Sequence, residues 1–126
     1  MTEVADRAPV YGDVHNPADV ETKIEETKNR IAAGVKIITN AEREAKKARR
    51  DFDLAFAYAI KNATGPEYQR KAEASITAMP HREAAENAEL ALHHAERTAK
   101  ALERELFAWQ SILNSVRAMY NVVGTR

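Results

Sequence analysis

A run of basic side chains at residues 43–50 is the part of this sequence whose residue types best suit a ligand. Four of these basic residues are spaced so that they lie on one side of a helix, and they are Arg43, Lys46, Lys47 and Arg50. Aromatic residues follow within two turns, at Phe52, Phe56 and Tyr58. Basic side chains bind phosphates and aromatic rings stack on bases, so this pattern is typical of a surface for single-stranded nucleic acid. The other residues predicted for this surface lie near the expected turn, and they are Lys61, Tyr68, Arg70 and Lys71.

A second interpretation of the basic run stays open. Runs of charge commonly form the solvated face of a helix, and Phe52 falls on the apolar seam described below. Under that interpretation the chain is a protein-interaction module, such as an adaptor, a scaffold or an inhibitor of a host protein, and does not bind nucleic acid.

The sequence contains few residues in a pattern that would support catalysis or metal binding. The pair His93-His94 lies near Glu89, but no Glu-x-x-His motif of the carboxylate-bridged metal bundles occurs. The chain has no cysteine, no P-loop and no nucleophile motif. We therefore expect that the protein is not an enzyme and that it has no metal site and no cofactor.

Composition and charge indicate a helical cytoplasmic protein. The 126 residues carry 19 basic and 19 acidic side chains, with a net excess of five acidic groups in residues 1–26 and of three basic groups in residues 41–71. No stretch is apolar enough to span a membrane, and the first residues lack the pattern of a signal peptide. The balanced total predicts no general attraction to polyanions, so any binding has to come from a local patch.

Apolar spacing predicts an all-α fold, a long antiparallel helical hairpin that resembles a coiled coil. A flexible acidic tail is expected at 1–15, and a hairpin domain at 16–124. In that domain one helix covers about 17–61, a connector with a short helix covers 62–80, and a second helix covers about 80–123. Asn16 and Pro17 suit the start of the first helix, and Gly65 with Pro66 suits its end.

The seams of both helices alternate spacings of four and three residues. The first seam is Val20, Ile24, Thr27, Ile31, Gly34, Ile38, Ala41, Ala45, Ala48, Phe52, Ala55 and Ala59. The second is Ala88, Leu92, Ala95, Ala99, Leu102, Leu106, Trp109, Leu113, Val116, Tyr120 and Val123. Folding at the middle of the connector places residue i near residue 142 − i, and Gly34 is expected to allow close approach of another backbone.

Apolar residues outside the seams predict a homo-oligomer that associates through the helix termini. Phe107, Ile112 and Met119 are expected to form a second stripe on the C-terminal helix. The residues predicted for the interface are Phe107, Trp109, Ile112, Leu113, Val116, Met119 and Tyr120. The alternative is that a different protein docks onto that stripe.

The chain resembles the phage UvsY-type recombination mediators over residues 40–123. The similarity lies in two long helices, a connector that contains Gly65-Pro66-Glu67-Tyr68, and the motif Ser111-Ile112-Leu113-Asn114-Ser115-Val116. It implies a non-enzymatic oligomer, with the oligomerisation motif on Ser111, Ile112, Leu113, Ser115 and Val116. It also implies single-stranded DNA and a recombinase as partners, in recombination or replication in the host cytoplasm. The zero net charge and acidic N-terminal segment depart from that family.

Overall fold

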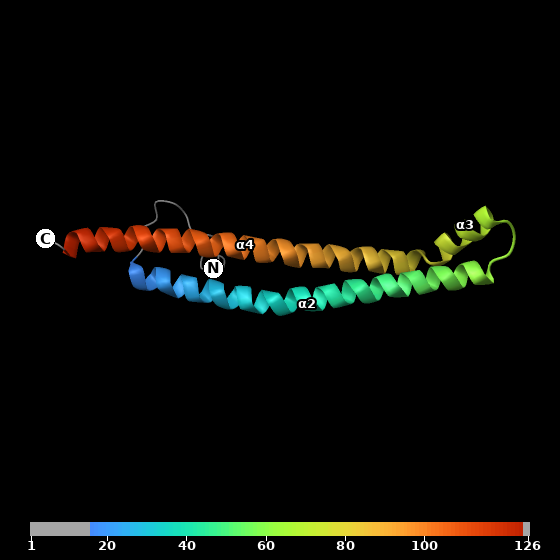
Figure 1. Ribbon diagram of the computed structural model, residues 1–126, viewed down its shortest axis with the longest axis horizontal. Helices are drawn as coiled ribbons and strands as arrows, with labels where there is room; N and C mark the ends of the chain where they lie inside the picture. Colours follow the sequence, from blue (N-terminus) through green and yellow to red (C-terminus); the bar gives the residue numbers. More distant parts are fainter. Residues whose placement is uncertain (1–15, 125–126) are drawn as a thin grey trace, which may run out of the picture. The chain divides into compact units, whose positions relative to one another are not determined.

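The computed structural model describes the backbone of residues 16–124 and the side chains of residues 16–121. It contains the helices α2 (Pro17–Asn62), α3 (Glu67–Thr77) and α4 (Met79–Gly124) (Figure 1). The two long helices pack antiparallel and α3 connects them, so the predicted all-α fold is confirmed. The expected tail at 1–15 lies outside the described residues.

The start of α2 is capped by side chains, as its sequence predicts. The backbone N–H of Asp19 donates to Oδ1 of Asn16 at 2.9 Å, and Nδ2 of Asn16 donates to Oδ2 of Asp19 at 2.8 Å. The first bond satisfies a backbone donor that has no partner within the helix. Asp19 also places a negative charge beside the positive end of the helix dipole.

The connector folds back on the end of α2. Gly65 has a φ of 105°, which turns the chain in a conformation that an L side chain rarely adopts. One turn into α3, Nη2 of Arg70 donates to the carbonyl oxygen of Ile60 at 3.4 Å, close to the end of α2. Ala74 of α3 and Ala78, which follows the last residue of α3, are completely buried, so the connector is packed by small side chains.

The helices pack in two compact units, of which the first combines residues 16–35 with residues 97–124. Its core consists of Val20, Ile24, Trp109 and Leu113, with Leu106 and Ile112 packed against it. Large apolar side chains bury the most area per contact, so this unit holds most of the hydrophobic stabilisation.

The second unit consists of residues 36–96 and has a seam of small side chains. Ala41, Ala45 and Ala48 of α2 are half-buried, as are Ala88 and Ala95 of α4. Alanine brings little apolar area into contact, so this half of the hairpin is stabilised less than the first unit.

The predicted register of the two helices is wrong by four to seven residues. Glu21 bonds to Arg117 rather than facing residue 121, and Arg30 lies 3.8 Å from Glu105 rather than facing residue 112. In the second unit α3 lies beside the last turns of α2, so α4 starts opposite an earlier part of α2 than an evenly folded connector requires (Figure 1). A shift near one heptad keeps the two seams face to face, which is why the fold class is unaffected.

The role expected for Gly34 is also wrong. A Cβ built on Gly34 meets no atom within 4 Å, so no backbone approaches this glycine closely. Its side of the helix is open space, and the residue only weakens the helix there. No helix among residues 16–124 is long and apolar enough to cross a membrane.

Candidate nucleic-acid interface

The outward face of α2 in the second unit carries a line of positive charge that we call the basic stripe, defined as Lys36, Arg43, Lys47, Arg50 and Lys61. Every second seam residue of this part of α2 is half-buried, and these residues are Ile31, Ile38, Ala45, Phe52 and Ala59. The positions two and five residues after each of these five residues therefore face away from α4. Between residues 36 and 61 these outward positions are all exposed. Those that are not basic are Asn40, Leu54 and Ala57, and none is acidic.

The charges of the basic stripe are available to a ligand. Among residues 16–121, no member of the stripe takes part in an ion pair. The acidic residues of this part of α2 lie on the flanks, where Oδ1 of Asp53 lies 3.6 Å from Nε of Arg49 in an ion pair. At about 1.5 Å per residue the stripe extends for about 38 Å, which is enough to follow several phosphates of a single strand.

Lys36 was missed by the sequence prediction although a signal for it exists. Lys36, Arg43 and Arg50 recur at intervals of seven residues, which places them on one line along the helix. Lys36 stands alone one heptad before the dense run at 43–50, so the local density of charge does not indicate it.

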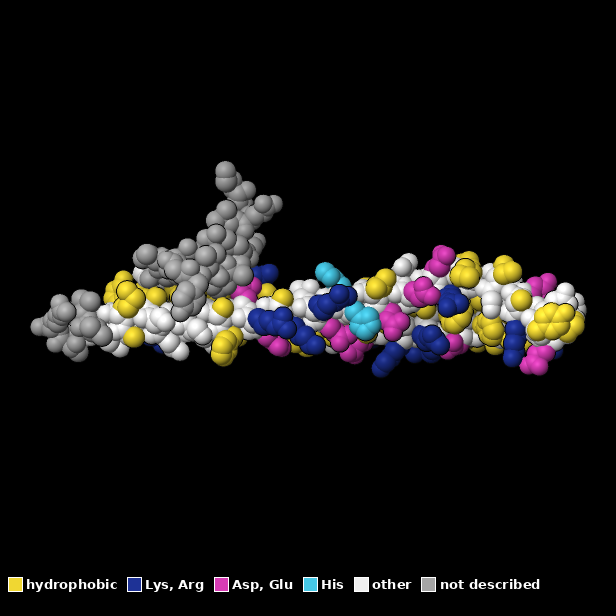
Figure 2. Space-filling model, turned by 90° about the horizontal axis from the view of Figure 1, so that it is seen from above, with side chains coloured by type: hydrophobic (Ala, Val, Ile, Leu, Met, Phe, Trp, Pro, Cys, Tyr) yellow, Lys and Arg dark blue, Asp and Glu magenta, His cyan; other side chains and the backbone are white. Residues whose placement is uncertain are grey.

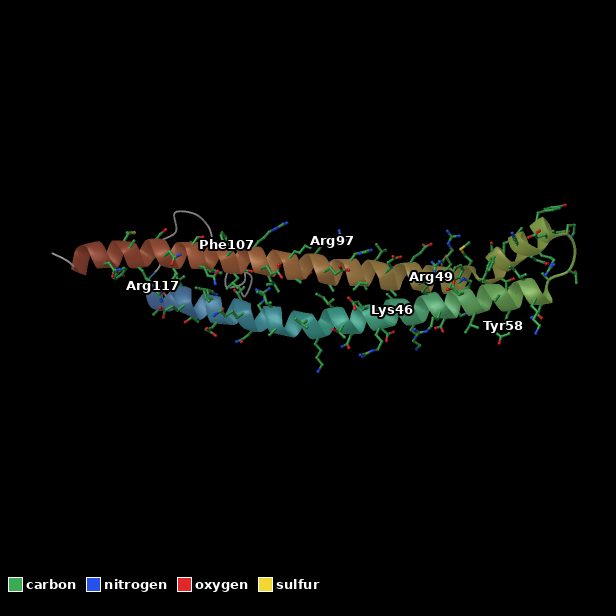
Figure 3. All side chains as sticks on the ribbon, in the orientation of Figure 1. Lys46, Arg49, Tyr58, Arg97, Phe107 and Arg117 are labelled. Carbon is green, nitrogen blue, oxygen red and sulfur yellow. The ribbon has the colours of Figure 1, made fainter. Side chains whose placement is uncertain are left out.

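The flank of α2 beside the stripe carries the predicted aromatic residues. Cζ of Arg49 lies 5.6 Å from the centroid of the Phe52 ring, and the Phe52 and Phe56 rings are 6.2 Å apart at an angle of 46°. Lys46 and Arg49 project from α2, and Tyr58 lies further along the same helix (Figure 3). Tyr58 is exposed while the two phenylalanines are half-buried, so only part of this aromatic set is open to stacking.

The predicted residues near the turn have different surroundings. Arg70 is half-buried and donates to Ile60, so it helps to hold α3 on α2. Lys71 lies 3.2 Å from Glu67 in an exposed pair within α3, and Tyr68 is exposed. Of these three, Arg70 has a structural contact that competes with ligand binding.

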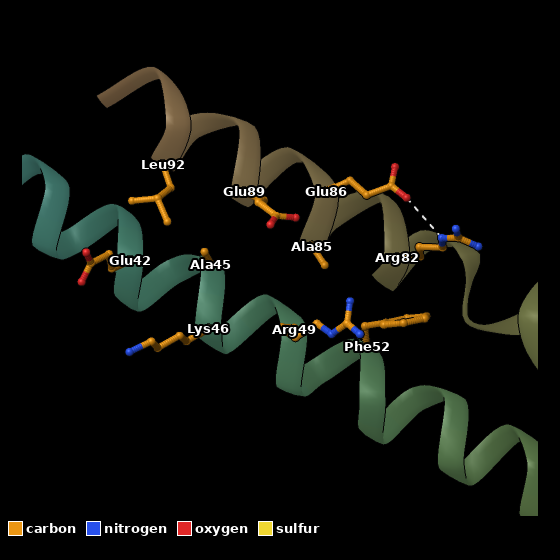
Figure 4. Close-up of a pocket in the computed structure, with 10 residues that line it drawn as sticks. All are labelled: Glu42, Ala45, Lys46, Arg49, Phe52, Arg82, Ala85, Glu86, Glu89 and Leu92. Atoms are coloured by element: carbon orange, nitrogen blue, oxygen red, sulfur yellow. Dashed lines mark hydrogen bonds and ion pairs between the residues drawn. The ribbon is translucent and has the colours of Figure 1, made fainter. Parts of the chain in front are cut away.

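A groove of about 690 Å³ lies between α2 and α4 in the second unit (Figure 4). Its apolar lining consists of Ala45, Phe52, Ala85 and Leu92. Charged side chains of both signs line the rest, and they are Glu42, Lys46, Arg49, Arg82, Glu86 and Glu89. Ala45 on α2 and Ala85 on α4 have small side chains, which leave space along the groove that larger side chains would fill.

The predicted interface residues divide into a buried and an exposed set. Trp109, Leu113 and Val116 are buried by the chain's own helices, and Ile112 packs against their core. The exposed set consists of Phe107, Met119 and Tyr120.

The three residues expected to form a second stripe do not share one face. Ile112 touches the core while Phe107 is 72% exposed and lines a shallow depression with Lys100 and Arg104. Five residues correspond to about 140° around a helix, which separates these two side chains. Tyr120 lies on the seam but is 58% exposed, because the shifted register carries the end of α4 past the start of α2.

Metal ligands do not gather in the described part of the chain. No group of three or more His, Cys, Asp or Glu side chains there could hold a metal ion. His93 lies 3.7 Å from Glu96 and is exposed, as expected for a solvated helix surface. On the face shown in Figure 2, histidine side chains lie among intermixed acidic and basic groups.

Comparison of the chain with protein-family models, curated proteins and solved structures found no match. The resemblance of residues 40–123 to the UvsY-type mediators therefore stays a prediction.

Proposed function

We propose that this protein is a non-enzymatic accessory factor that binds single-stranded DNA through the basic stripe. The observation that carries the proposal is an exposed line of five basic residues that make no ion pair among the described residues, with no acidic residue at the outward-facing positions between them. Lysine and arginine neutralise phosphates and release condensed counterions, and this gain does not depend on the base sequence. A chain with a net charge of zero needs such a local concentration of charge to bind DNA.

The direct test is fluorescence anisotropy with a labelled 30-nucleotide single strand, titrated with protein at several salt concentrations. We expect binding at low salt and a linear fall of log K with log salt, because each phosphate contact contributes about −0.7 to that slope. An unlabelled duplex of the same sequence serves as competitor. Absence of binding at 20 mM salt would exclude the proposed function.

Self-association belongs to the same proposal. Met119 and Tyr120 are exposed at the end of α4, where the seam continues beyond its partner helix. An oligomer would present several basic stripes to one strand, and linked sites raise the apparent affinity without a new contact. Mass measurement in solution, with and without the single strand, tests both association and binding. A role in recombination or replication, with a recombinase as partner, fits the resemblance in residues 111–116.

A second candidate function is a protein-interaction module without nucleic-acid binding. It is favoured by the exposure of large apolar side chains in the first unit, above all Phe107 and Met119. Exposed apolar residues of this size commonly mark contact surfaces for other proteins. A stoichiometric complex with a host protein, formed by a chain that binds no single strand, would support this function instead.

A further inference from the structure

We infer that the groove between α2 and α4 receives DNA bases that carry exocyclic amino groups, from a strand whose phosphates lie on the basic stripe. This inference rests on the proposed function and extends it from backbone binding to a preference among bases. It is carried by the position and the charge of the side chains that line the groove.

The apolar lining of the groove suits a flat, partly apolar ring. Ala45 and Ala85 leave the space open, while Phe52 and Leu92 provide apolar surface beside it. Arg49 already lies over the Phe52 ring at 5.6 Å, so a guanidinium plane and an aromatic ring meet at this point (Figure 4). Bases stack on both kinds of surface in single-strand binding proteins.

The charges around the groove that remain without partners are mainly carboxylates. Arg49 pairs with Asp53, and Arg82 donates from Nε to Oε1 of Glu86 at 3.1 Å. Within the described residues, Glu42 and Glu89 make no ion pair, and Lys46 is the one lining cation without one. The groove thus offers two carboxylates that can only accept hydrogen bonds.

Carboxylates select for the amino groups of bases. Cytosine, adenine and guanine present exocyclic N–H₂ groups that donate to an ionised carboxylate, whereas thymine has only its ring N3–H, which lies between two carbonyl oxygens. Two carboxylate oxygens would repel those carbonyls.

The stripe and the groove are close enough for one strand to use both. Glu42 precedes Arg43 directly, and adjacent residues are about 100° apart around a helix. Lys46 lines the groove and lies next to Lys47 of the stripe. A nucleotide can therefore place its phosphate on the outward face of α2 and its base on the flank.

Anisotropy titrations with labelled oligo-dC and oligo-dT of equal length, at pH 8 and matched salt, test the inference. We expect oligo-dC to bind about fivefold or more tightly than oligo-dT. The double variant Glu42→Gln/Glu89→Gln should abolish the preference, because an amide both donates and accepts. Glu83→Gln is the control, since it removes one exposed carboxylate of the same unit that does not line the groove.

The possible outcomes separate the two proposals. Equal binding of both oligonucleotides by the parent chain overturns the base preference and leaves the proposed function intact. A preference that survives in the double variant overturns the assignment to the groove. If neither oligonucleotide binds at low salt, the proposed function fails and the preference fails with it.

Discussion

Arg117 of α4 donates a hydrogen bond from Nη2 to Oε1 of Glu21 on α2, at 2.8 Å. The two side chains are about half exposed, so solvent screens their attraction and the pair contributes only about 0–1 kcal/mol. Its position is more informative than its energy. With Arg30 and Glu105, it joins the two helices of the first unit at a register that differs from an evenly folded hairpin.

Exchange of the two charges tests this pairing. Glu21→Arg and Arg117→Glu should each lower the free energy of unfolding by up to about 1 kcal/mol, because each places like charges together. The double variant should recover most of that loss. Urea unfolding followed by circular dichroism gives the three values, and strictly additive losses would show that the residues do not interact.

Gly34 offers a stabilising substitution. Gly34→Ala should raise the free energy of unfolding by up to about 1 kcal/mol, since the added Cβ meets no atom and alanine favours the helix. Gly65→Ala is the contrasting variant, because φ there is 105° and the new Cβ would lie 2.9 Å from Oε1 of Gln69. It should lower stability in the same urea experiment. A loss of stability in Gly34→Ala would mean that a neighbouring group does occupy that space.

The cap of α2 should be measurable in the same way. Asn16→Ala removes the acceptor of the Asp19 backbone N–H and should cost about 0.5–2 kcal/mol. Asn29→Ala is the matched control, since Asn29 is exposed in the middle of the helix and alanine is favoured there. Equal effects of the two substitutions would contradict a capping role for Asn16.

The basic stripe makes a specific prediction about salt dependence. Arg43→Ala/Lys47→Ala/Arg50→Ala should weaken single-strand binding and reduce the slope of log K against log salt by about 2, as three phosphate contacts are lost. A variant with the same change of charge elsewhere, Lys28→Ala/Lys100→Ala/Arg104→Ala, should keep the parent slope. If both variants lose affinity equally, only the overall charge matters and the stripe is not the binding surface.

Substitution of two aromatic residues that lie close together on α4 should change the free energy of unfolding by very different amounts. Phe107→Ser should change the free energy of unfolding by less than about 0.5 kcal/mol, because the ring is 72% exposed. Trp109→Ala should cost about 3–5 kcal/mol, because that side chain fills the core of the first unit. A large loss from Phe107→Ser would show that this ring is covered by a second chain in solution, and the mass of the variant would then fall.

Local chemistry made the helices predictable. Asn16 and Pro17 mark the start of α2, Gly65 turns the chain, and the alternating spacings identify the residues that meet in the seams. These signals lie within a few helical turns of each other in the sequence, where backbone hydrogen bonding and the helix period determine the secondary structure. The helix bounds therefore agree with the sequence prediction to about one residue.

The register, the groove and the exposure of Tyr120 were decided only by the tertiary structure. A heptad seam matches itself again after seven residues, so spacing alone leaves several alignments of nearly equal merit. The fold-back of α3 on the end of α2, where Arg70 donates to the carbonyl oxygen of Ile60, selects among them. That selection places Ala45 and Ala85 along one groove and leaves Tyr120 exposed near the end of α4. The sequence determined which faces meet, and contacts between distant residues determined where along the helices they do so.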